Sequence, residues 1–226
     1  MNSYRHSKAG QEVHPVQLSH TDSRSHWNKV YETKPIEKLG WYEDKADPSL
    51  YLIEKCKLQQ SSAILHVGAG ATTLIDTLET LGYVNLYVND ISHVALEKLK
   101  ARLGNGGSSI QWIEDDLTNP HQLNNIKNVE LWHDRAVLHF FTQQKDQEAY
   151  FQLLKSVVAK GGYVIIAVFN LEGALHCSGL PVFRYSEAML SDRLGEQFSL
   201  IESFDHMYTM PSGNTRSYIY TLYQRK

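Results

Sequence analysis

The sequence contains little cysteine: Cys56 and Cys177 are the only two in 226 residues. Two cysteines cannot build the disulfide framework of a small secreted domain, and their separation matches neither a redox Cys-x-x-Cys pair nor a zinc-ligand pattern. No run of about 18 apolar residues is present, and the N-terminal segment lacks the apolar stretch of a signal peptide. These absences predict a cytoplasmic protein without a membrane span.

The sequence also lacks a strong excess of either charge. Lys and Arg total 22 against 25 Asp and Glu, for a formal net charge of -3. Without a large positive field, a dedicated nucleic-acid-binding surface is disfavoured. Hydrophobic residues make up 42% and charged residues 21%, as in globular domains. A length of 226 residues exceeds a usual domain of about 150 residues, which favours one large domain with an appended segment.

The appended segment begins with a polar stretch. Residues 1–24 carry no apolar periodicity, which predicts a flexible tail. Four N-terminal histidines are spaced too irregularly to favour a metal site: His6, His14, His20 and His26. Helical order is expected from near Asp22 or Ser25, and the segment HWNKVYETK places Trp27, Val30 and Tyr31 on one helical face.

Most of the remaining chain alternates between short apolar segments and segments of helical period. The apolar segments predict strands at 63–67, 85–89, 109–113, 129–133 and 163–169. Helices are predicted after an N-cap at Asp47, over 72–81, 92–103 and 143–159, and as one turn near 118–126. The glycine pair at 161–162 is expected to end the helix over 143–159. This alternation builds a parallel sheet covered by helices on both faces.

The C-terminal segment breaks the alternation. SEAMLSDRLG predicts a helix, and FSLIESFDHMYTM and TRSYIYTLYQ predict two strands joined by the short turn PSGN. Two strands joined in this way are antiparallel, so the predicted sheet ends in a hairpin. The sequence shows neither an internal repeat nor a second domain.

A glycine-containing loop follows the first predicted strand. In AILHVGAGATTLIDTL, a buried strand leads through Gly68, Ala69 and Gly70 into a helix. Glycine lets backbone N–H groups approach a ligand, and the N-terminus of the following helix favours negative charge. The pattern is typical of a nucleotide-binding loop, although a strand followed by Gly-x-Gly also occurs as a simple tight turn.

An acidic residue ends the next predicted strand. Asp90 lies 20 residues beyond Gly70, the spacing at which an acid reaches ribose hydroxyls in doubly wound folds. The alternative function of Asp90 is to cap the helix that begins near Ser92.

Three features favour S-adenosylmethionine over a dinucleotide as the ligand. Thr73 stands where the third glycine of a dinucleotide loop would lie. The third strand ends in the acidic segment 114–117, which suits an adenine amino group. The C-terminal antiparallel pair, without a substrate domain, fits a compact transferase better than a dehydrogenase.

With these features together, residues 25–226 resemble a class I S-adenosylmethionine-dependent methyltransferase. The resemblance implies an α/β, doubly wound, Rossmann-like sheet of seven mostly parallel strands in the order 3-2-1-4-5-7-6, with a C-terminal antiparallel hairpin and an N-terminal helical lid at 25–60. It implies S-adenosylmethionine as cofactor, with S-adenosylhomocysteine as product. The implied cofactor contacts are Gly68, Ala69, Gly70, Asp90, Ile91, Asp115, Asp116 and Leu117.

One position departs from that family. The family usually has an acid two residues before the first glycine, where it helps to hold the methionine ammonium, and this chain has His66. Either another group supplies that contact or the affinity for the cofactor is reduced. A neutral histidine can still accept a hydrogen bond, so inactivity does not follow.

A narrower resemblance concerns thiopurine-methyltransferase-like enzymes. HWNKVYETKP with GWYE downstream is similar to their N-terminal aromatic segment, and WHDRAVLHF (132–140) is similar to their motif after the fourth strand, with His133 inserted and Ala136 in place of glycine. The resemblance implies that Trp27, Tyr31 and Trp41 wall the cofactor site. It also places Asp134 and Arg135 beside the sulfonium.

The end of the fourth strand offers candidate catalytic residues. His133 or Asp134 could accept a proton, although His133 could equally satisfy a core hydrogen bond and Asp134 could pair with Arg135 or cap the next helix. Arg135 could bind the cofactor carboxylate or an acidic substrate, and His133 is also a candidate cofactor contact. His139 is interpreted as structural.

A long loop after the fifth strand, at 170–185, is the expected position of substrate specificity. Cys177, Arg184 and Tyr185 are its candidate substrate contacts. Two adjacent potential ligands, His176 and Cys177, without another pair do not predict a metal site.

The sequence therefore predicts an enzyme that methylates a small-molecule thiol, amine or carboxylate, and it predicts no nucleic-acid or membrane partner. A protein-lysine methyltransferase is the nearest alternative. An NAD-dependent oxidoreductase and a non-catalytic cofactor-binding protein are the alternatives outside the class. The oligomeric state is left open.

Overall fold

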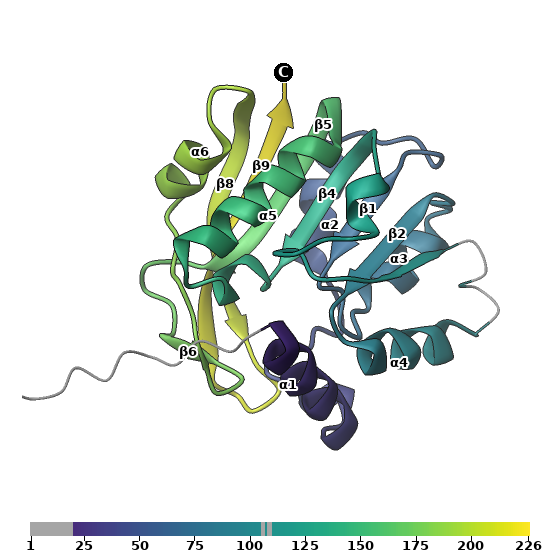
Figure 1. Cartoon of the computed structure of the whole chain (residues 1–226), viewed down its shortest axis with the longest axis vertical. Helices are drawn as coiled ribbons and strands as arrows, with labels where there is room; N and C mark the ends of the chain where they lie inside the picture. The colour runs from purple at the N-terminus through teal and green to yellow at the C-terminus, as the bar shows by residue number, and fades with distance from the viewer. Residues whose placement is uncertain (1–19, 105–106, 108–109) are drawn as a thin grey trace, which may run out of the picture.

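The computed structural model describes residues 20–104, 107 and 110–226, and Figure 1 shows how its helices and strands are arranged. The predicted flexible tail falls for the most part outside these residues, since residues 1–19 are not described. Residues 20–24, which were assigned to the same tail, are helical: α1 spans His20–Thr33 and begins two residues before Asp22.

Seven strands form the main sheet, in the order β3-β2-β1-β4-β5-β9-β8. The strands are β1 (Ile64–Val67), β2 (Leu86–Asp90), β3 (Gln111–Glu114), β4 (Val129–Arg135), β5 (Val158–Phe169), β8 (Phe198–Thr209) and β9 (Thr215–Arg225). The pairs from β3 to β5 are parallel, whereas β9 runs antiparallel to both β5 and β8. The order 3-2-1-4-5-7-6 and the C-terminal hairpin are confirmed, with β8 and β9 as the sixth and seventh strands of the prediction.

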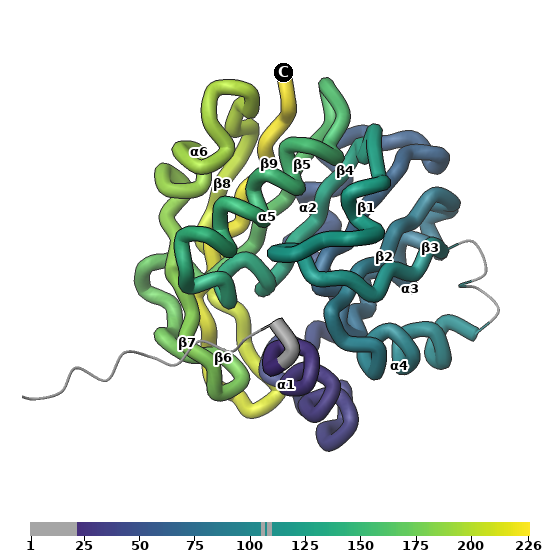
Figure 2. The backbone as a smooth tube through the Cα atoms, viewed as in Figure 1, coloured from purple at the N-terminus to yellow at the C-terminus, as the bar shows by residue number. Residues whose placement is uncertain are grey.

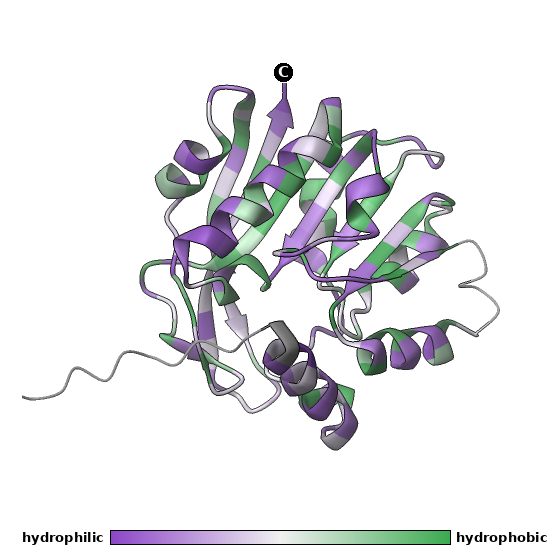
Figure 3. Ribbon diagram, in the orientation of Figure 1, coloured by the Kyte–Doolittle hydropathy of each residue, from purple (hydrophilic) through white to green (hydrophobic). Residues whose placement is uncertain are grey.

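Helices cover both faces of the sheet (Figure 1). The helices are α2 (Asp47–Lys55), α3 (Leu74–Thr80), α4 (His93–Leu103), α5 (Gln144–Val157) and α6 (Glu187–Leu194), with the short 3₁₀ helices η1 (Ile36–Lys38), η3 (Leu123–Asn125) and η4 (Leu138–Phe140). Side chains of α2, α3 and α4 share one core cluster, and those of α5, α6 and η3 share the other. In Figure 3 the strands between these two layers carry apolar residues interspersed with polar ones, and the helices also show both kinds along their length.

The alternation of side chains along the strands decides which layer each residue joins. On β1, Ile64 belongs to the α2 and α3 layer, whereas Leu65 and Val67 belong to the α5 layer. On β4, Leu131 faces the first layer and Trp132 faces the second. Successive side chains of a strand point to opposite faces, so this pattern also fixes the direction of the polar residues at the strand ends.

The junction between α5 and β5 differs from the prediction. The helix ends at Val157 instead of reaching the glycine pair, and β5 already begins at Val158. Val158 pairs with Val129 and Tyr163 pairs with Leu131, so the strand bulges between these points. Gly161 has φ +77 inside the bulge, a conformation that favours glycine. The glycines therefore bend a strand and do not stop a helix.

Three other boundaries also differ. Asp47 is the first residue of α2 and Ala46 is its N-cap, without a side-chain capping bond. The predicted turn near 118–126 contains only the 3₁₀ turn η3. The loop after β5 forms a second, unpredicted sheet of two short strands, β6 (His176–Cys177) and β7 (Leu180–Pro181).

The N-terminal segment lies across the end of the main sheet where the parallel strands finish. Figures 1 and 2 show α1 at this edge, with the β6–β7 hairpin beside it. Val30 and Tyr31 of α1 share a small apolar cluster with Ala71 and Ala95. The Nζ of Lys98 on α4 donates to the carbonyl of Tyr31. These contacts place the segment that we call the lid, residues 20–46, over the carboxyl ends of the strands.

Candidate functional site

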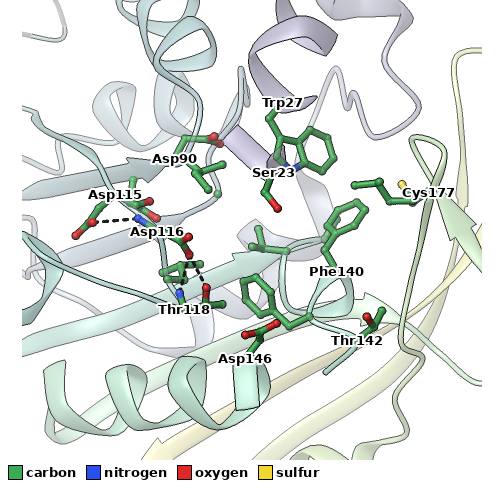
Figure 4. Close-up of a pocket in the computed structure, with 18 of the residues that line it drawn as sticks. Ser23, Trp27, Asp90, Asp115, Asp116, Thr118, Phe140, Thr142, Asp146 and Cys177 are labelled. Atoms are coloured by element: carbon green, nitrogen blue, oxygen red, sulfur yellow. Dashed lines mark hydrogen bonds between the residues drawn. The ribbon is translucent and has the colours of Figure 1, made fainter. Parts of the chain in front are cut away.

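A cavity of about 440 Å³ lies between the carboxyl ends of the parallel strands and the lid. Figure 4 shows its wall, with Trp27 from α1, Asp90 from β2, Asp116 from the loop after β3 and Cys177 from the hairpin. Eleven of the predicted site residues line it: Trp27, Tyr31, Trp41, Gly68, Asp90, Ile91, Asp115, Asp116, Leu117, Arg135 and Cys177. We call this space the larger cavity.

The glycine loop is closely packed by its neighbours. Gly68 and Gly70 have φ +55 and +56, in the region that favours glycine. A Cβ at Gly68 would lie 2.1 Å from a methyl carbon of Val137, and one at Gly70 would lie 2.2 Å from the Tyr31 hydroxyl. Both positions therefore require glycine, in part because the lid packs directly on the loop. Gly70 itself does not line the larger cavity.

Asp90 connects the glycine loop to β2. One carboxylate oxygen accepts from the Gly70 N–H at 2.7 Å, and the other accepts from the Ser92 N–H at 2.7 Å. Ser92, and not Asp90, is the N-cap of α4, since its hydroxyl accepts from the Ala95 N–H. Burial raises the pKa of Asp90 to about 6, against the lowering effect of its backbone hydrogen bonds. Each carboxylate oxygen can accept a second hydrogen bond, and the side chain lines the larger cavity.

The acids after β3 have different surroundings. The Asp115 carboxylate accepts from the N–H groups of Asp116, His121, Gln122 and Leu123 and so organises the loop. Asp116 accepts from the N–H and hydroxyl of Thr118, both at 2.8 Å (Figure 4). All three acids line the larger cavity, but the Asp115 carboxylate is occupied by the N–H groups of its loop, so Asp116 and Asp90 are the better candidates for contact with a ligand.

The hydrogen bonds of Asn89 indicate whether this end of the cavity suits an adenosine. Its amide nitrogen donates to the carbonyls of Ile113 and Asp115, at 3.1 and 3.0 Å, which fixes the orientation of the amide. Its Oδ1 is buried without a hydrogen-bond partner among the described residues. An unpartnered acceptor beside the carboxylates of Asp90 and Asp116 suits a ligand rich in donors, such as ribose hydroxyls and an exocyclic amine.

Aromatic side chains form the lid side of the cavity. The Trp27 ring makes edge contacts with Trp41 and Phe140, with ring centroids 5.5 and 4.9 Å apart. The Trp41 indole donates to the Tyr31 hydroxyl at 3.1 Å. Such rings attract a cation and exclude water. Phe140 and the adjacent Phe141 were not predicted, although two aromatic residues soon after a strand end at the ligand edge are a usable signal.

Asp134 does not reach either cavity. Its side chain is fully buried and accepts from the Tyr150 hydroxyl at 2.7 Å and from the N–H groups of Val137 and Leu138 at 3.0 and 3.1 Å. Burial raises the pKa of Asp134 to about 6. The physical reason is alternation: Asp134 points to the same face as Trp132, toward α5, so its carboxylate holds the start of η4.

His133 lies behind the cavity, in contact with His66. The two residues are register partners on β4 and β1, and their Nδ1 atoms are 2.6 Å apart. The His133 Nε2 is 2.9 Å from the Ser49 hydroxyl of α2. Burial lowers the pKa of His66 to about 4 and that of His133 well below its ordinary value. Both rings are therefore neutral at pH 7.

These histidines line a smaller cavity of about 50 Å³. Ala69 also lines it, whereas it does not line the larger cavity. Trp41, Gly68 and Arg135 line both spaces, which are thus neighbours across these side chains.

Arg135 joins the lid to the sheet. Its guanidinium donates to the carbonyl of Trp41 at 2.9 Å and to the Tyr220 hydroxyl at 3.1 Å, and lies 2.9 Å from a carboxylate oxygen of Glu43. The ring of Tyr218 is 5.2 Å from the guanidinium carbon. Arg135 is the predicted catalytic and cofactor residue of β4 that reaches the larger cavity.

The loop at 170–185 contributes only one of its three predicted residues to the wall. Cys177 lines the larger cavity, and burial raises the pKa of its thiol to about 11. Arg184 instead donates to the carbonyls of Leu171 and Gly173, within its own loop. Tyr185 is buried against the ring of Phe183 and lies outside the cavity wall.

The wall contains further residues that the sequence did not indicate: Ser23, Asn89, Thr118, Ala136, Val137, Phe140, Phe141, Thr142, Lys145, Asp146, Leu180 and Pro181. Lys145 and Asp146 come from the first turn of α5 and Thr142 from the loop just before it, and this region forms one side of the cavity (Figure 4). These residues line the cavity because of where α5 and the β6–β7 hairpin pack, and local sequence motifs do not predict that packing.

The described residues contain no cluster of three or more His, Cys, Asp or Glu arranged to hold a metal ion. Among the helices of the same residues, none is both long and apolar enough to cross a membrane.

Comparison with known proteins agrees with this geometry. Residues 65–166 match the family described as a methyltransferase domain. No curated protein matches the sequence.

Solved structures share the fold at low sequence identity. An S-adenosylmethionine-dependent methyltransferase from Anabaena variabilis has a TM-score of 0.74 and 13% identity, covering 97% of this chain and 100% of its own. The 1,6-didemethyltoxoflavin-N1-methyltransferase of Burkholderia thailandensis, solved with 1,6-didemethyltoxoflavin and S-adenosylhomocysteine, has a TM-score of 0.65 and 14% identity, covering 94% of each chain. An N-methyltransferase from Bradyrhizobium japonicum, in complex with S-adenosyl-L-homocysteine, has a TM-score of 0.63 and 14% identity, covering 88% of this chain and 98% of its own.

The solved structures support the fold, and the family match covers the glycine loop, Asp90, the acidic loop and β4. The chain therefore has the fold of class I S-adenosylmethionine-dependent methyltransferases, its residues 65–166 are similar to a methyltransferase domain, and one end of its cavity is lined by acceptors that suit an adenosine.

Proposed function

We propose that the protein methylates a small molecule, through a thiol, amine or carboxylate, inside the larger cavity. The observation that carries this proposal is the covered cavity itself. At about 440 Å³ it lies in the lower part of the range for ligand sites, roughly 300–1,000 Å³. A space of that size leaves little room beside an adenosyl cofactor, which favours a small acceptor over a folded protein or a nucleic acid.

The two ends of the cavity suit different parts of the reaction. S-adenosylmethionine supplies the methyl group on a sulfonium. Asp90 and Asp116 offer acceptors for the adenosine at one end. At the other end, Trp27 and Phe140 face the hairpin residue Cys177 (Figure 4). These rings would stabilise the sulfonium, by about 0.5–2 kcal/mol per contact, and exclude water from an in-line transfer.

The positions of the β4 side chains favour some methyl acceptors over others. His133 and Asp134 were the predicted proton acceptors, and neither side chain lines the larger cavity. Lys145 and Asp146 also line the wall, from α5, and Figure 4 shows Asp146 on the opposite side of the cavity from Trp27 of the lid. We therefore favour acceptors that need no strong base: a thiolate, a carboxylate or a neutral amine. On this proposal Asp134 positions η4 and Phe140, and Arg135 holds the lid and faces the cofactor.

Calorimetric titration with S-adenosylhomocysteine, S-adenosylmethionine and NAD tests the cofactor part. We expect the two adenosyl compounds to bind with dissociation constants well below about 1 mM, and NAD not to bind. Binding of NAD alone would contradict the proposal.

A panel of small thiols, amines and carboxylates, assayed by the formation of S-adenosylhomocysteine, then tests the acceptor. A denatured protein panel serves as the comparison. Turnover confined to protein lysines would replace the small-molecule proposal by the lysine alternative, and cofactor binding without any turnover would favour a non-catalytic protein.

A further inference from the structure

The smaller cavity has a mixed wall, in which apolar residues of the lid and of the region around α3 surround a group of polar and charged side chains. Its wall includes Glu43, Ser49, His66, His133 and Arg135. It adjoins the larger cavity across Gly68, the first residue of the glycine loop. These polar side chains, next to an adenosine site, suit the polar tail of the same ligand.

Glu43 is the only acidic residue among the described residues that line the smaller cavity. Its side chain is 11% exposed and lies 2.9 Å from the Arg135 guanidinium. Burial raises the pKa of Glu43, while the adjacent Arg135 lowers it. His66, at the position where an acid is usual, is neutral and cannot supply a negative charge.

The backbone around Glu43 is fixed by three successive carbonyl groups. The Trp41 carbonyl accepts from Arg135 at 2.9 Å, the Tyr42 carbonyl accepts from the Tyr208 hydroxyl, and the Glu43 carbonyl accepts from the Thr73 hydroxyl at 3.0 Å. These partners come from β4, β8 and the residue before α3. The carboxylate is therefore held in place, on a segment that belongs to the lid.

Glu43 and Arg135 present opposite charges side by side to the smaller cavity. An amino-acid tail carries an ammonium and a carboxylate on one carbon, so such a pair matches the charges of the tail in sign. A carboxylate can accept up to about four hydrogen bonds, so Glu43 can accept from an ammonium while it keeps its contact with Arg135.

We propose that Glu43 binds the ammonium group of the cofactor's amino-acid tail, in place of the acid that is absent at His66, with Arg135 beside the tail carboxylate. This inference rests on the proposed use of S-adenosylmethionine in the larger cavity. The lid then supplies a cofactor ligand, so cofactor binding and the closed position of the lid depend on each other.

The experiment compares ligands with and without the tail. S-adenosylhomocysteine and 5′-methylthioadenosine share the adenosine and the sulfur, but only the first carries the amino acid. We expect Glu43→Gln to weaken the binding of S-adenosylhomocysteine by about ten- to hundredfold, the effect of losing one hydrogen bond between charged groups. We expect the affinity for 5′-methylthioadenosine to stay within about twofold of the wild-type value.

Two further variants act as controls. Asp44 is the next residue, is exposed, and has the same charge, so Asp44→Asn should leave both affinities unchanged. In the Glu43→Gln background, His66→Asp returns an acid to the usual position and should restore most of the affinity for S-adenosylhomocysteine. The wild-type protein should also bind desamino-S-adenosylhomocysteine about as weakly as Glu43→Gln binds the complete ligand, a comparison that needs no variant.

Equal weakening of both ligands by Glu43→Gln would overturn the inference, because it would mean that Glu43 only holds the lid. Unchanged binding of S-adenosylhomocysteine, or equal wild-type affinity for the desamino compound, would also overturn it. The proposed function fails separately, if neither S-adenosylhomocysteine nor 5′-methylthioadenosine binds the wild-type protein.

Discussion

Asp90 and Asp134 occupy similar positions and have different surroundings. Each lies at or next to the end of a parallel strand, is buried, and has its pKa raised to about 6 by burial. Each accepts from two backbone N–H groups, those of Gly70 and Ser92 for Asp90 and those of Val137 and Leu138 for Asp134. Asp90 nevertheless lines the larger cavity, whereas Asp134 is turned away from it toward Tyr150. An acid at this edge of a sheet therefore lines the cavity only if strand alternation turns its side chain to the face on which the cavity opens.

The largest expected effect is a loss of folding stability when Asp134 is replaced. Asp134→Ala leaves a buried hydroxyl and two buried N–H groups without their acceptor, so we expect the free energy of unfolding to fall by about 3 kcal/mol. Urea denaturation followed by tryptophan fluorescence measures this loss. Asp116→Ala removes an acid of the same charge at the cavity wall. It should cost less stability and more affinity for S-adenosylhomocysteine. If Asp134→Ala left stability unchanged but removed turnover, Asp134 would be catalytic after all.

A second prediction concerns the loop that Asp90 holds. Gly70→Ala adds a Cβ at 2.2 Å from the Tyr31 hydroxyl, so the loop or the lid must move. Overpacking of this kind costs about 1–3 kcal/mol, and we expect the affinity for S-adenosylhomocysteine to fall by about ten- to hundredfold. Gly195→Ala is the matched control, because φ is +75 there and nothing lies within 4 Å of the added Cβ. Equal cofactor affinities in both variants would show that the contact between lid and loop does not matter for binding.

Whether a part of the molecule could be predicted from the sequence depends on whether its structure is determined by residues close together in the chain. The glycine loop, Asp90 and Asp116 were predicted from backbone conformation and from position along the chain, both of which leave local signatures, and the structure places Gly68, Asp90 and Asp116 at the wall of the larger cavity. The strand order was predictable because alternation of strands and helices and a C-terminal hairpin allow few arrangements. The β4 residues were assigned one by one from a motif, without counting which face each side chain would take. Counting from the buried Leu131 would have turned Arg135 toward the lid and Asp134 away from it.

Other parts of the wall were not accessible from the sequence. Thr142, Lys145 and Asp146 line the cavity because of where the start of α5 and the loop before it pack. Cys177 lines it because it belongs to the β6–β7 hairpin, which the sequence pattern did not predict. Arg184, in contrast, bonds to carbonyls of its own loop. Glu43 follows Trp41 by two residues in a segment noted for its aromatic residues, and its importance depends on the absence of an acid at His66 and on contacts with β4, β8 and Thr73.

A third prediction uses pH to test Asp90. Its pKa of about 6 is raised above the ordinary value, so lowering the pH through 6 protonates the carboxylate in the cofactor-free protein. If ribose hydroxyls donate to Asp90, the ionised form binds better. The affinity for S-adenosylhomocysteine should then weaken by up to about tenfold for each pH unit below 6 and stay level above pH 7. Calorimetry between pH 5 and 8 measures this, and Asp90→Asn should remove the dependence. A profile that Asp90→Asn leaves intact would assign it to another group.

The raised pKa values of Asp90 and Asp134 also affect the pH dependence of folding stability. An aspartic acid with a higher pKa in the folded than in the unfolded state binds more protons when folded. Its contribution to stability is therefore complete below the unfolded value of 3.8 and is lost as the pH rises through about 6. Cofactor-free protein should lose stability from pH 4 to 7, and Asp134→Asn should reduce that loss without changing the pH profile of ligand binding. This separates the two acids by pH alone.

The smallest expected effect on cofactor affinity is that of a substitution at His66, on β1. His66→Asp in the wild-type background places an acid where one is usual, next to the smaller cavity. An added charge-assisted hydrogen bond would tighten the binding of S-adenosylhomocysteine by about 1 kcal/mol, roughly fivefold. Because Glu43 already supplies a carboxylate there, the gain should be smaller than the restoration that the same substitution gives in the Glu43→Gln background. Equal gains in the two backgrounds would mean that positions 43 and 66 act independently. Unequal gains, measured as a coupling between the two positions, would show that the lid and β1 contribute to one binding site for the ammonium.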